Sequence, residues 1–229
     1  MRRFLEESFN SVKFILSDLE EMGIKGVDLS EKSLAILAKW EKETPEPAFD
    51  DIQRNISLCS HCAPDLSTKA KLLPPPSGKI RVLFIDAMPG KEALDEGTSM
   101  GGEAGVLLWK IIQSMGLLPD NVYITHCLMC RVSKRRLGSL HLPCRDFLKD
   151  LIALFKPEVL CALGEGAGRF LSGKDETLSR LRGHFSSFES IPLMITHHPE
   201  DLLLHPELKR ETWEDVKKMI AVLNRTDGA

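Results

Sequence analysis

Five of the six cysteines fall at spacings that suit a metal centre. The first C-x2-C pair is Cys59 and Cys62, and the second is Cys127 and Cys130. Cys144 follows further along the chain. Two thiolates at this spacing can bind one metal ion or one cluster. Spacing alone allows zinc in a four-cysteine site or an iron–sulfur cluster, and it leaves five thiols for four positions. Unrelated buried thiols are the alternative interpretation.

Positive charge follows the second cysteine pair directly. Four cations lie in this stretch: Arg131, Lys134, Arg135 and Arg136. The net charge of -3 provides no general cationic field, so nucleic-acid binding must come from a local patch of this kind. We therefore expect these side chains to contact phosphate groups, with a solvated turn as the simpler alternative.

The composition is that of a globular protein with one sizeable core. The chain has 229 residues, of which 43% are hydrophobic and 28% charged, and no apolar run approaches the length of a membrane span. Charges are spread through the start, "MRRFLEESFNSVKFILSDLEEM", which does not fit a signal peptide. We expect a cytoplasmic protein with reduced thiols, in which Cys161, inside an apolar run, is a core residue.

Short apolar runs predict strands, and the amphipathic stretches between them predict helices. The expected strands cover residues 80–86, 121–125, 158–164 and 191–199. Their alternation with helices indicates an α/β fold with a central four-stranded parallel sheet flanked by helices on both faces. Residues 1–50 are predicted to form an N-terminal helical extension, and residues 51–229 the α/β domain.

The stretches that could do chemistry lie where the predicted strands end. They cover residues 86–105, 126–144, 164–168 and 197–199. In parallel α/β sheets, ligands bind beyond the carboxyl ends of the strands. The sequence therefore predicts one site at this edge, built from several loops.

The order of these motifs resembles the family 4 uracil-DNA glycosylases, the iron–sulfur members of the uracil-DNA glycosylase superfamily. The resemblance covers about residues 56–222. The stretches that carry it are "DAMPG" (86–90), "TSMGGEAGVLL" (98–108), "VYITHCLMCR" (122–131) and "HPEDLLL" (198–204). It implies a DNA-repair enzyme that flips a damaged base out of DNA and hydrolyses its N-glycosidic bond.

The same resemblance selects the metal ligands. It implies that a [4Fe–4S] cluster, with zinc as the alternative, is held by Cys59, Cys62, Cys130 and Cys144. Cys127 is then an extra thiol outside the ligand set. The implied role of the cluster is structural, because it would hold in place the loop that carries the basic residues.

The resemblance also implies roles for the residues at the strand ends, although the sequence departs from the family at three positions. Ala87 stands where the family has a glutamate, Met100 where it has a phenylalanine, and His126 where it has an asparagine. The retained His198 would stabilise the departing base, Asp86 would position water, and His126 would read the base. The expected base pocket comprises Ala87, Met88, Pro89, Gly90 and Met100, and Leu203 is expected to fill the gap left by the flipped nucleotide.

Two hypotheses of different classes follow. The first is a divergent glycosylase acting on uracil or on another deaminated base, such as hypoxanthine or xanthine. A variant of it has His126 or His141 trapping the deoxyribose covalently. The second is a non-catalytic iron–sulfur module that binds nucleic acid and has lost the activity. Under both hypotheses we expect a monomer that binds single- or double-stranded DNA and does not associate with a membrane.

Overall fold

The computed structural model describes residues 48–61, 69–132 and 142–226, all of which belong to the compact unit Glu46–Ala229. The predicted N-terminal extension lies outside these residues, so its boundary near residue 50 stays a prediction. Four predicted site residues lie outside them as well: Cys62, Lys134, Arg135 and Arg136. His141 does too.

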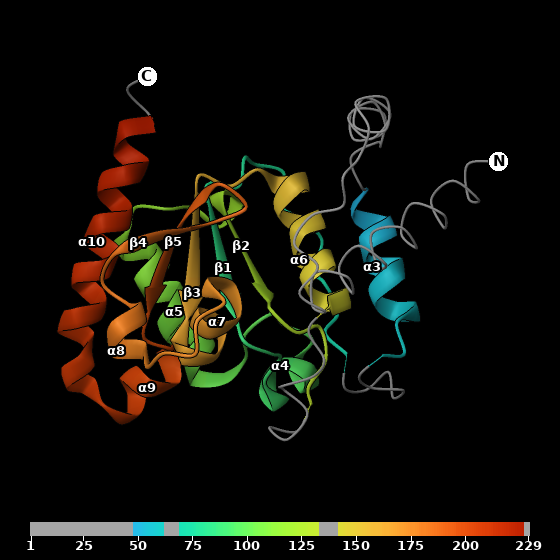
Figure 1. Cartoon of the computed structure of the whole chain (residues 1–229), viewed down its shortest axis with the longest axis horizontal. Coiled ribbons are helices and arrows are strands. Elements are labelled where there is room, and N and C mark those ends of the chain that lie inside the picture. Colours follow the sequence, from blue (N-terminus) through green and yellow to red (C-terminus); the bar gives the residue numbers. More distant parts are fainter. Residues whose placement is uncertain (1–47, 62–68, 133–141, 227–229) are drawn as a thin grey trace, which may run out of the picture. The chain divides into compact units, whose positions relative to one another are not determined.

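The core of the fold is a five-stranded sheet with the order β2-β1-β3-β5-β4 (Figure 1). The four predicted strands are confirmed, and all of them run parallel: β1 (Val82–Asp86), β2 (Val122–His126), β3 (Val159–Leu163) and β5 (Ile191–Thr196). The fifth strand, β4 (Phe185–Phe188), pairs antiparallel with β5 at the edge and was not predicted. Its central Ser186 and Ser187 are exposed, so it lacks the apolar run that marks the other strands.

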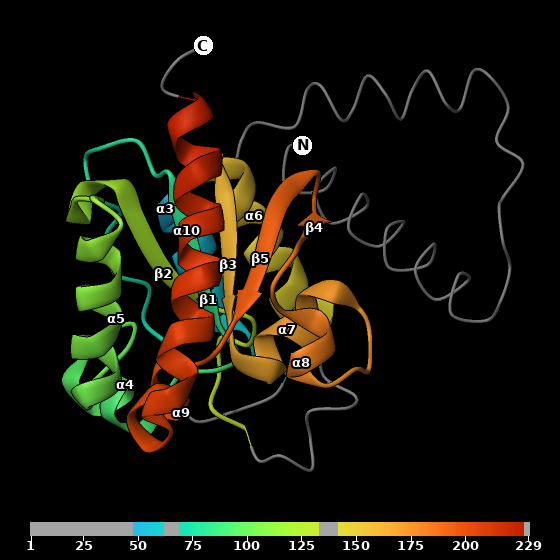
Figure 2. The same cartoon turned by 90° about the vertical axis from the view of Figure 1, so that its left-hand side faces the viewer.

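Helices cover both faces of the sheet, as predicted (Figure 2). Val82 and Phe84 point to the face covered by α5 (Gly102–Ser114) and α10 (Lys209–Thr226). Leu83 and Ile85 point to the opposite face, covered by α6 (Leu142–Phe155), α7 (Gly164–Ser172) and α8 (Leu178–Leu181). Successive strand residues face opposite sides, so a strand buried on both faces reads as a continuous apolar run.

A further helix, α3 (Phe49–Leu58), lies beside α6 (Figure 1). Its buried Ile52 and Ile56 belong to an apolar cluster that includes Leu151 and Cys144 of α6. This packing brings the end of α3, next to Cys59, into the same part of the fold as the start of α6.

Short helices occupy the loops at the carboxyl ends of the strands. The loop after β1 contains α4 (Lys91–Glu96), and the loop after β5 contains α9 (Pro199–Leu204). The 3-10 turns Pro119–Asn121 and Pro206–Leu208 precede β2 and α10. Among the residues that the structure describes, no helix is long and apolar enough to cross a membrane.

Candidate active site

A cavity of about 750 Å³ opens at the carboxyl ends of β1, β3 and β5. This is the sheet edge where the sequence predicted a site. Its size lies within the range of about 300–1,000 Å³ that is usual for small-molecule sites. The lining residues are Asp86, Ala87, Met88, Pro89, Gly90, Glu92, Arg131, Val132, Leu163, Gly164, Glu165, Gly166, His198, Glu200 and Asp201.

Two predicted catalytic residues meet in this cavity. Asp86 ends β1, and His198 is the N-cap residue of α9. His198 Nε2 lies 3.4 Å from Asp86 Oδ1, and the side chains are only 16% and 15% exposed. The Ala87 backbone N–H donates to the same Asp86 oxygen at 2.6 Å, which fixes the carboxylate.

The hydrogen bonds of His198 define where its proton lies. The Glu200 backbone N–H donates to His198 Nδ1 at 3.2 Å, so Nδ1 is the acceptor of the neutral ring. The proton of the neutral ring therefore lies on Nε2, the nitrogen that faces Asp86. Within the described residues, Nε2 is buried without a well-aligned hydrogen-bond partner. This N–H faces Asp86 and is covered, so the side chains around it must shift before it can donate to a ligand in the cavity.

Competing effects set the pKa of His198. Burial lowers it, but the interaction with Asp86 and the charges of Glu200 and Asp201 raise it, and the net result is a pKa above its usual value. A histidine whose pKa rises on folding stabilises the fold at pH values below its unfolded pKa. That contribution is lost as the pH rises through the folded pKa.

The Asp86→Asn variant should reverse the pH dependence of the contribution that His198 makes to stability. Without the carboxylate, burial dominates and the charged form of His198 is disfavoured. We expect the stability difference between wild type and D86N to grow as the pH falls from about 8.5 to about 5.5, through the histidine range. Urea midpoints measured across this range test it, and a pH-independent difference would contradict the coupling.

Two glycines allow the first turn of α7, directly after β3, to approach the site closely. Gly164 has a φ of 80°, and a Cβ there would lie 3.0 Å from His198 Cβ. A Cβ on Gly166 would lie 2.9 Å from Ala87 Cβ. The sequence placed this loop at the correct edge, but nothing in it showed which residues the glycines would face.

We expect Gly164→Ala to destabilise the fold more than Gly173→Ala. Both glycines have positive φ values, of 80° and 68°, but a Cβ on Gly173 meets open space. G173A should cost about 1–2 kcal/mol for the left-handed backbone alone. G164A should cost about 1–3 kcal/mol more for the contact with His198. Chemical denaturation measures both, and equal losses would show that the contact is relieved without cost.

The third predicted catalytic residue, His126, is buried beside this cavity rather than lining it. It pairs in register with Asp86 across β1 and β2, and it is 3% exposed. Burial lowers its pKa, although Asp86 and a hydrogen bond with the Ser99 backbone act in the opposite direction. A hydrogen bond that raises a histidine pKa is one that the ring donates, so the Ser99 carbonyl accepts it. Its Nε2 is buried without a well-aligned hydrogen-bond partner among the described residues.

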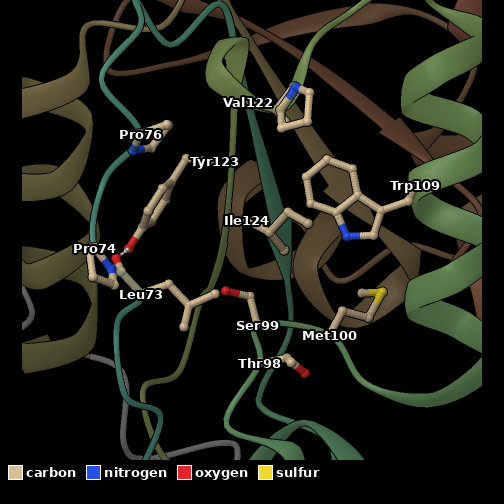
Figure 3. Close-up of a pocket in the computed structure, with 11 residues that line it drawn as sticks. Leu73, Pro74, Pro76, Thr98, Ser99, Met100, Trp109, Val122, Tyr123 and Ile124 are labelled. Atoms are coloured by element: carbon tan, nitrogen blue, oxygen red, sulfur yellow. Dashed lines mark hydrogen bonds between the residues drawn. The ribbon is translucent and has the colours of Figure 1, made fainter.

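The remaining predicted pocket and DNA contacts are dispersed. Met100 lines a second cavity along β2, and not the cavity of Asp86 and His198 (Figure 3). Leu203 lies on α9 and is 39% exposed. Arg131 lines the active-site cavity.

The charged side chains in the described lining of the cavity are mostly acidic. Carboxylates from five residues contribute to it: Asp86, Glu92, Glu165, Glu200 and Asp201. Arg169 pairs with Glu165 at 2.8 Å, but Arg131 is the one arginine or lysine in the described lining. Phosphate contacts must therefore come from Arg131 and from cations elsewhere.

The described cysteines of the predicted metal set are unbridged thiols in one part of the fold. Lys69 pairs with Cys130 in an antiparallel bridge, and its Nζ donates to the Ser57 carbonyl at 2.8 Å, two residues before Cys59. Cys144 packs in the apolar cluster between α3 and α6. Among the described residues, no three Cys, His, Asp or Glu side chains form a group that could hold a metal ion. The fourth predicted ligand, Cys62, lies outside them.

The fold and the sequence together identify the class of protein. Residues 75–217 match the Uracil DNA glycosylase superfamily, so the chain belongs to this superfamily. It is 30% identical to a type-4 uracil-DNA glycosylase of Archaeoglobus fulgidus over 184 residues, which cover 75% of this chain and 92% of the relative. A type-4 uracil-DNA glycosylase of Thermotoga maritima is 28% identical over 184 residues, covering 76% and 94% of the two chains.

Proposed function

We propose that this protein is a DNA glycosylase that hydrolyses the N-glycosidic bond of a flipped, deaminated base, with uracil as the first candidate. One observation carries the proposal: His198 Nε2, which carries the proton of the neutral ring, lies 3.4 Å from Asp86 Oδ1 beside a cavity at the strand ends. Superfamily membership and the type-4 relatives support the reaction class.

His198 stabilises the base as it leaves. Cleavage of the bond between C1′ and the base nitrogen leaves the electron pair, and hence negative charge, on the base. A positioned N–H donor that faces the carbonyl oxygen where this charge develops stabilises the transition state. The Glu200 N–H holds Nδ1, and the Gly164 backbone lies close to His198 Cβ, so the ring is oriented before the substrate arrives.

Asp86 completes the reaction by placing water. Water oxygen forms the new bond to C1′, and the proton that it loses passes to the carboxylate or to solvent. Ala87 has no carboxylate of its own, but its backbone N–H holds the Asp86 oxygen at 2.6 Å. The neighbouring residue therefore supplies the negative charge from within the same cavity.

His126 reads the base as an acceptor. Burial lowers the pKa of His126, so the ring is neutral near pH 7 and one of its two nitrogens is an acceptor. Deamination converts a ring nitrogen of cytosine or adenine from an acceptor into an N–H donor, which gives uracil and hypoxanthine a shared feature. An acceptor at this position favours deaminated bases as a class. Because Nε2 is buried, the atoms that cover it must shift for this contact to form.

The cluster site and the DNA contacts extend this proposal. Cys59, Cys62, Cys130 and Cys144 would hold a [4Fe–4S] cluster, with zinc as the alternative, since thiolates suit both and Lys69 joins the segments of Cys59 and Cys130. When bound, the cluster would link the end of α3 to the loop after β2. Phosphates would contact Arg131, Lys134, Arg135 and Arg136, and Leu203 would enter the DNA.

A second function is favoured by the absence of a side-chain carboxylate at Ala87. The chain would then be a non-catalytic iron–sulfur module that binds nucleic acid. The two functions differ in what His198 and Asp86 do. Their substitution abolishes base release by a glycosylase, but it leaves the affinity of a binding module largely intact.

One gel tests the proposal. Labelled oligonucleotides carrying uracil, hypoxanthine or xanthine, single- and double-stranded, are incubated with the protein and divided into alkali-treated and untreated halves. Strand cleavage only after alkali is the expected result and identifies the base. Intact strands in every lane, with visible absorbance showing that the cluster is present, would transfer the assignment to the binding module. A slow, denaturant-resistant band would indicate covalent capture.

A further inference from the structure

The second cavity of the structure has no role in the chemistry described above. It lies along the free edge of β2 and has a volume of about 280 Å³ (Figure 3). The indole of Trp109 faces it from α5 and Ile124 faces it from β2, with Met100 at one end. Tyr123 projects to the other side of the strand, beside Pro74 and Pro76. The cavity is just smaller than the range of about 300–1,000 Å³ typical of drug-sized ligands, so it suits a single ring system.

The lining combines flat apolar surface with a few polar groups. Trp109 and Met100 offer stacking surface, and the hydroxyls of Thr98 and Ser99 lie at the end near Met100 (Figure 3). The Tyr123 hydroxyl donates to the Leu73 carbonyl at 2.6 Å, so Tyr123 contributes its ring alone. A planar heterocycle with polar atoms on its edge, such as a nucleobase, matches this combination.

Exposed apolar side chains lie on the two helices between this cavity and the active site. α9, which begins beside His198, packs against α5. Leu203 and Leu204 on α9 are 39% and 74% exposed, and Val106 and Trp109 on α5 are 57% and 37% exposed. Trp109 lies about 10 Å along α5 from its first residue, a distance that a few nucleotides of an extended strand can bridge. Four large apolar side chains exposed on two packed helices favour an interaction site in this region.

We propose that the Trp109 cavity is a stacking site for an unpaired base of the bound DNA strand, a few nucleotides from the base held at His198. The proposal rests on the proposed function, because its ligand is the DNA substrate. Indole–base stacking tolerates any sequence, so the site would strengthen binding to single-stranded DNA without selecting a sequence.

Tryptophan fluorescence tests whether a base enters the cavity. The chain has three tryptophans, so Trp40→Phe with Trp213→Phe leaves Trp109 as the sole indole. We expect single-stranded DNA to quench this emission at concentrations where free uridine and free uracil do not. Quenching by the free compounds at equal concentration would instead assign the cavity to a released base. Unchanged emission at saturating DNA would overturn the proposal.

A double-mutant cycle tests the contact directly. Trp109→Ala should weaken single-strand binding between about fivefold and about 150-fold, whereas Trp109→Phe retains most of the affinity. Trp213→Ala is the matched control, because Trp213 is 41% exposed but lies on α10 outside the cavity. A set of oligonucleotides is prepared in which each lacks one base, at a different distance from the uracil. At one of these distances the missing base already removes the contact, so W109A should cause no further loss of affinity there. If W109A lowers the affinity by the same factor at every position, the stacking site is overturned.

The two proposals fail in different ways. If no oligonucleotide loses its base but the single Trp109 is quenched and the cycle shows coupling, the glycosylase is wrong and the stacking site stands. If uracil is released but W109A binds like wild type, the stacking site is wrong and the glycosylase stands.

Discussion

His198→Ala is expected to slow base release about 10²–10³-fold, the usual loss when a single donor to a developing oxyanion is removed. The effect belongs to the chemical step, because Nε2 donates where charge appears only as the bond breaks. Single-turnover release of uracil from a labelled oligonucleotide, with protein in excess, isolates this step. DNA affinity should change little, since the side chain is 16% exposed within the cavity.

A histidine at the other end of α9 provides the control. His205 is the C-cap residue of α9, and its side chain is 61% exposed, 3.4 Å from Glu207. His205→Ala removes the same chemical group outside the cavity and should release uracil at the wild-type rate. Wild-type release by H198A would exclude His198 as the leaving-group donor.

Asp86 and His198 should behave as one unit. If Asp86 both places water and holds His198, D86N/H198A should release the base only slightly more slowly than the slower of the two single variants. The effects of groups that act together are non-additive. If the rate loss of the double variant equals the product of the two single losses, the two side chains act independently.

The strands were predictable because burial on both faces produces an apolar run. The sequences of β1 and β3, "VLFID" and "VLCAL", consist mostly of buried apolar residues. β4 carries no such signal, because its central serines are exposed and its place at the edge depends on pairing with β5. α4 was missed as well, since six residues within a glycine-rich stretch contain too few turns to show a helical period.

The site was predictable as far as strand ends determine it. Asp86 and His198 each end or follow a strand of a parallel sheet, so the topology brings them to one edge. The direction of His126 and Met100 depends on how the loop before α5 packs, which the sequence pattern does not contain. That loop hydrogen-bonds the His126 ring through Ser99 and places Met100 in the second cavity.

A partly buried charge network lies at the end of β5, where Thr196 and His197 directly precede His198. Arg182 Nη2 donates to Asp215 Oδ2 at 2.8 Å, and Thr196 Oγ1 donates to the same oxygen at 2.8 Å. Arg182 Nη1 also donates to Glu211 at 2.7 Å, and His197 Nε2 lies 3.1 Å from this carboxylate. The network joins α10 to the end of β5, the strand that leads into the active site.

Asp215→Ala is expected to lower the free energy of unfolding by about 3–5 kcal/mol, the usual cost of removing one partner of a buried ion pair. Asp215 is 0% exposed and the Arg182 side chain 15%, so water cannot replace the lost carboxylate. Thr196→Val removes one hydrogen bond and should cost about 0.5–1.5 kcal/mol. Glu214→Ala is the matched control, because its exposed pair with Lys217 on the same helix contributes little. Urea denaturation ranks the three, and a D215A loss no larger than that of E214A would show that the network does not stabilise the fold.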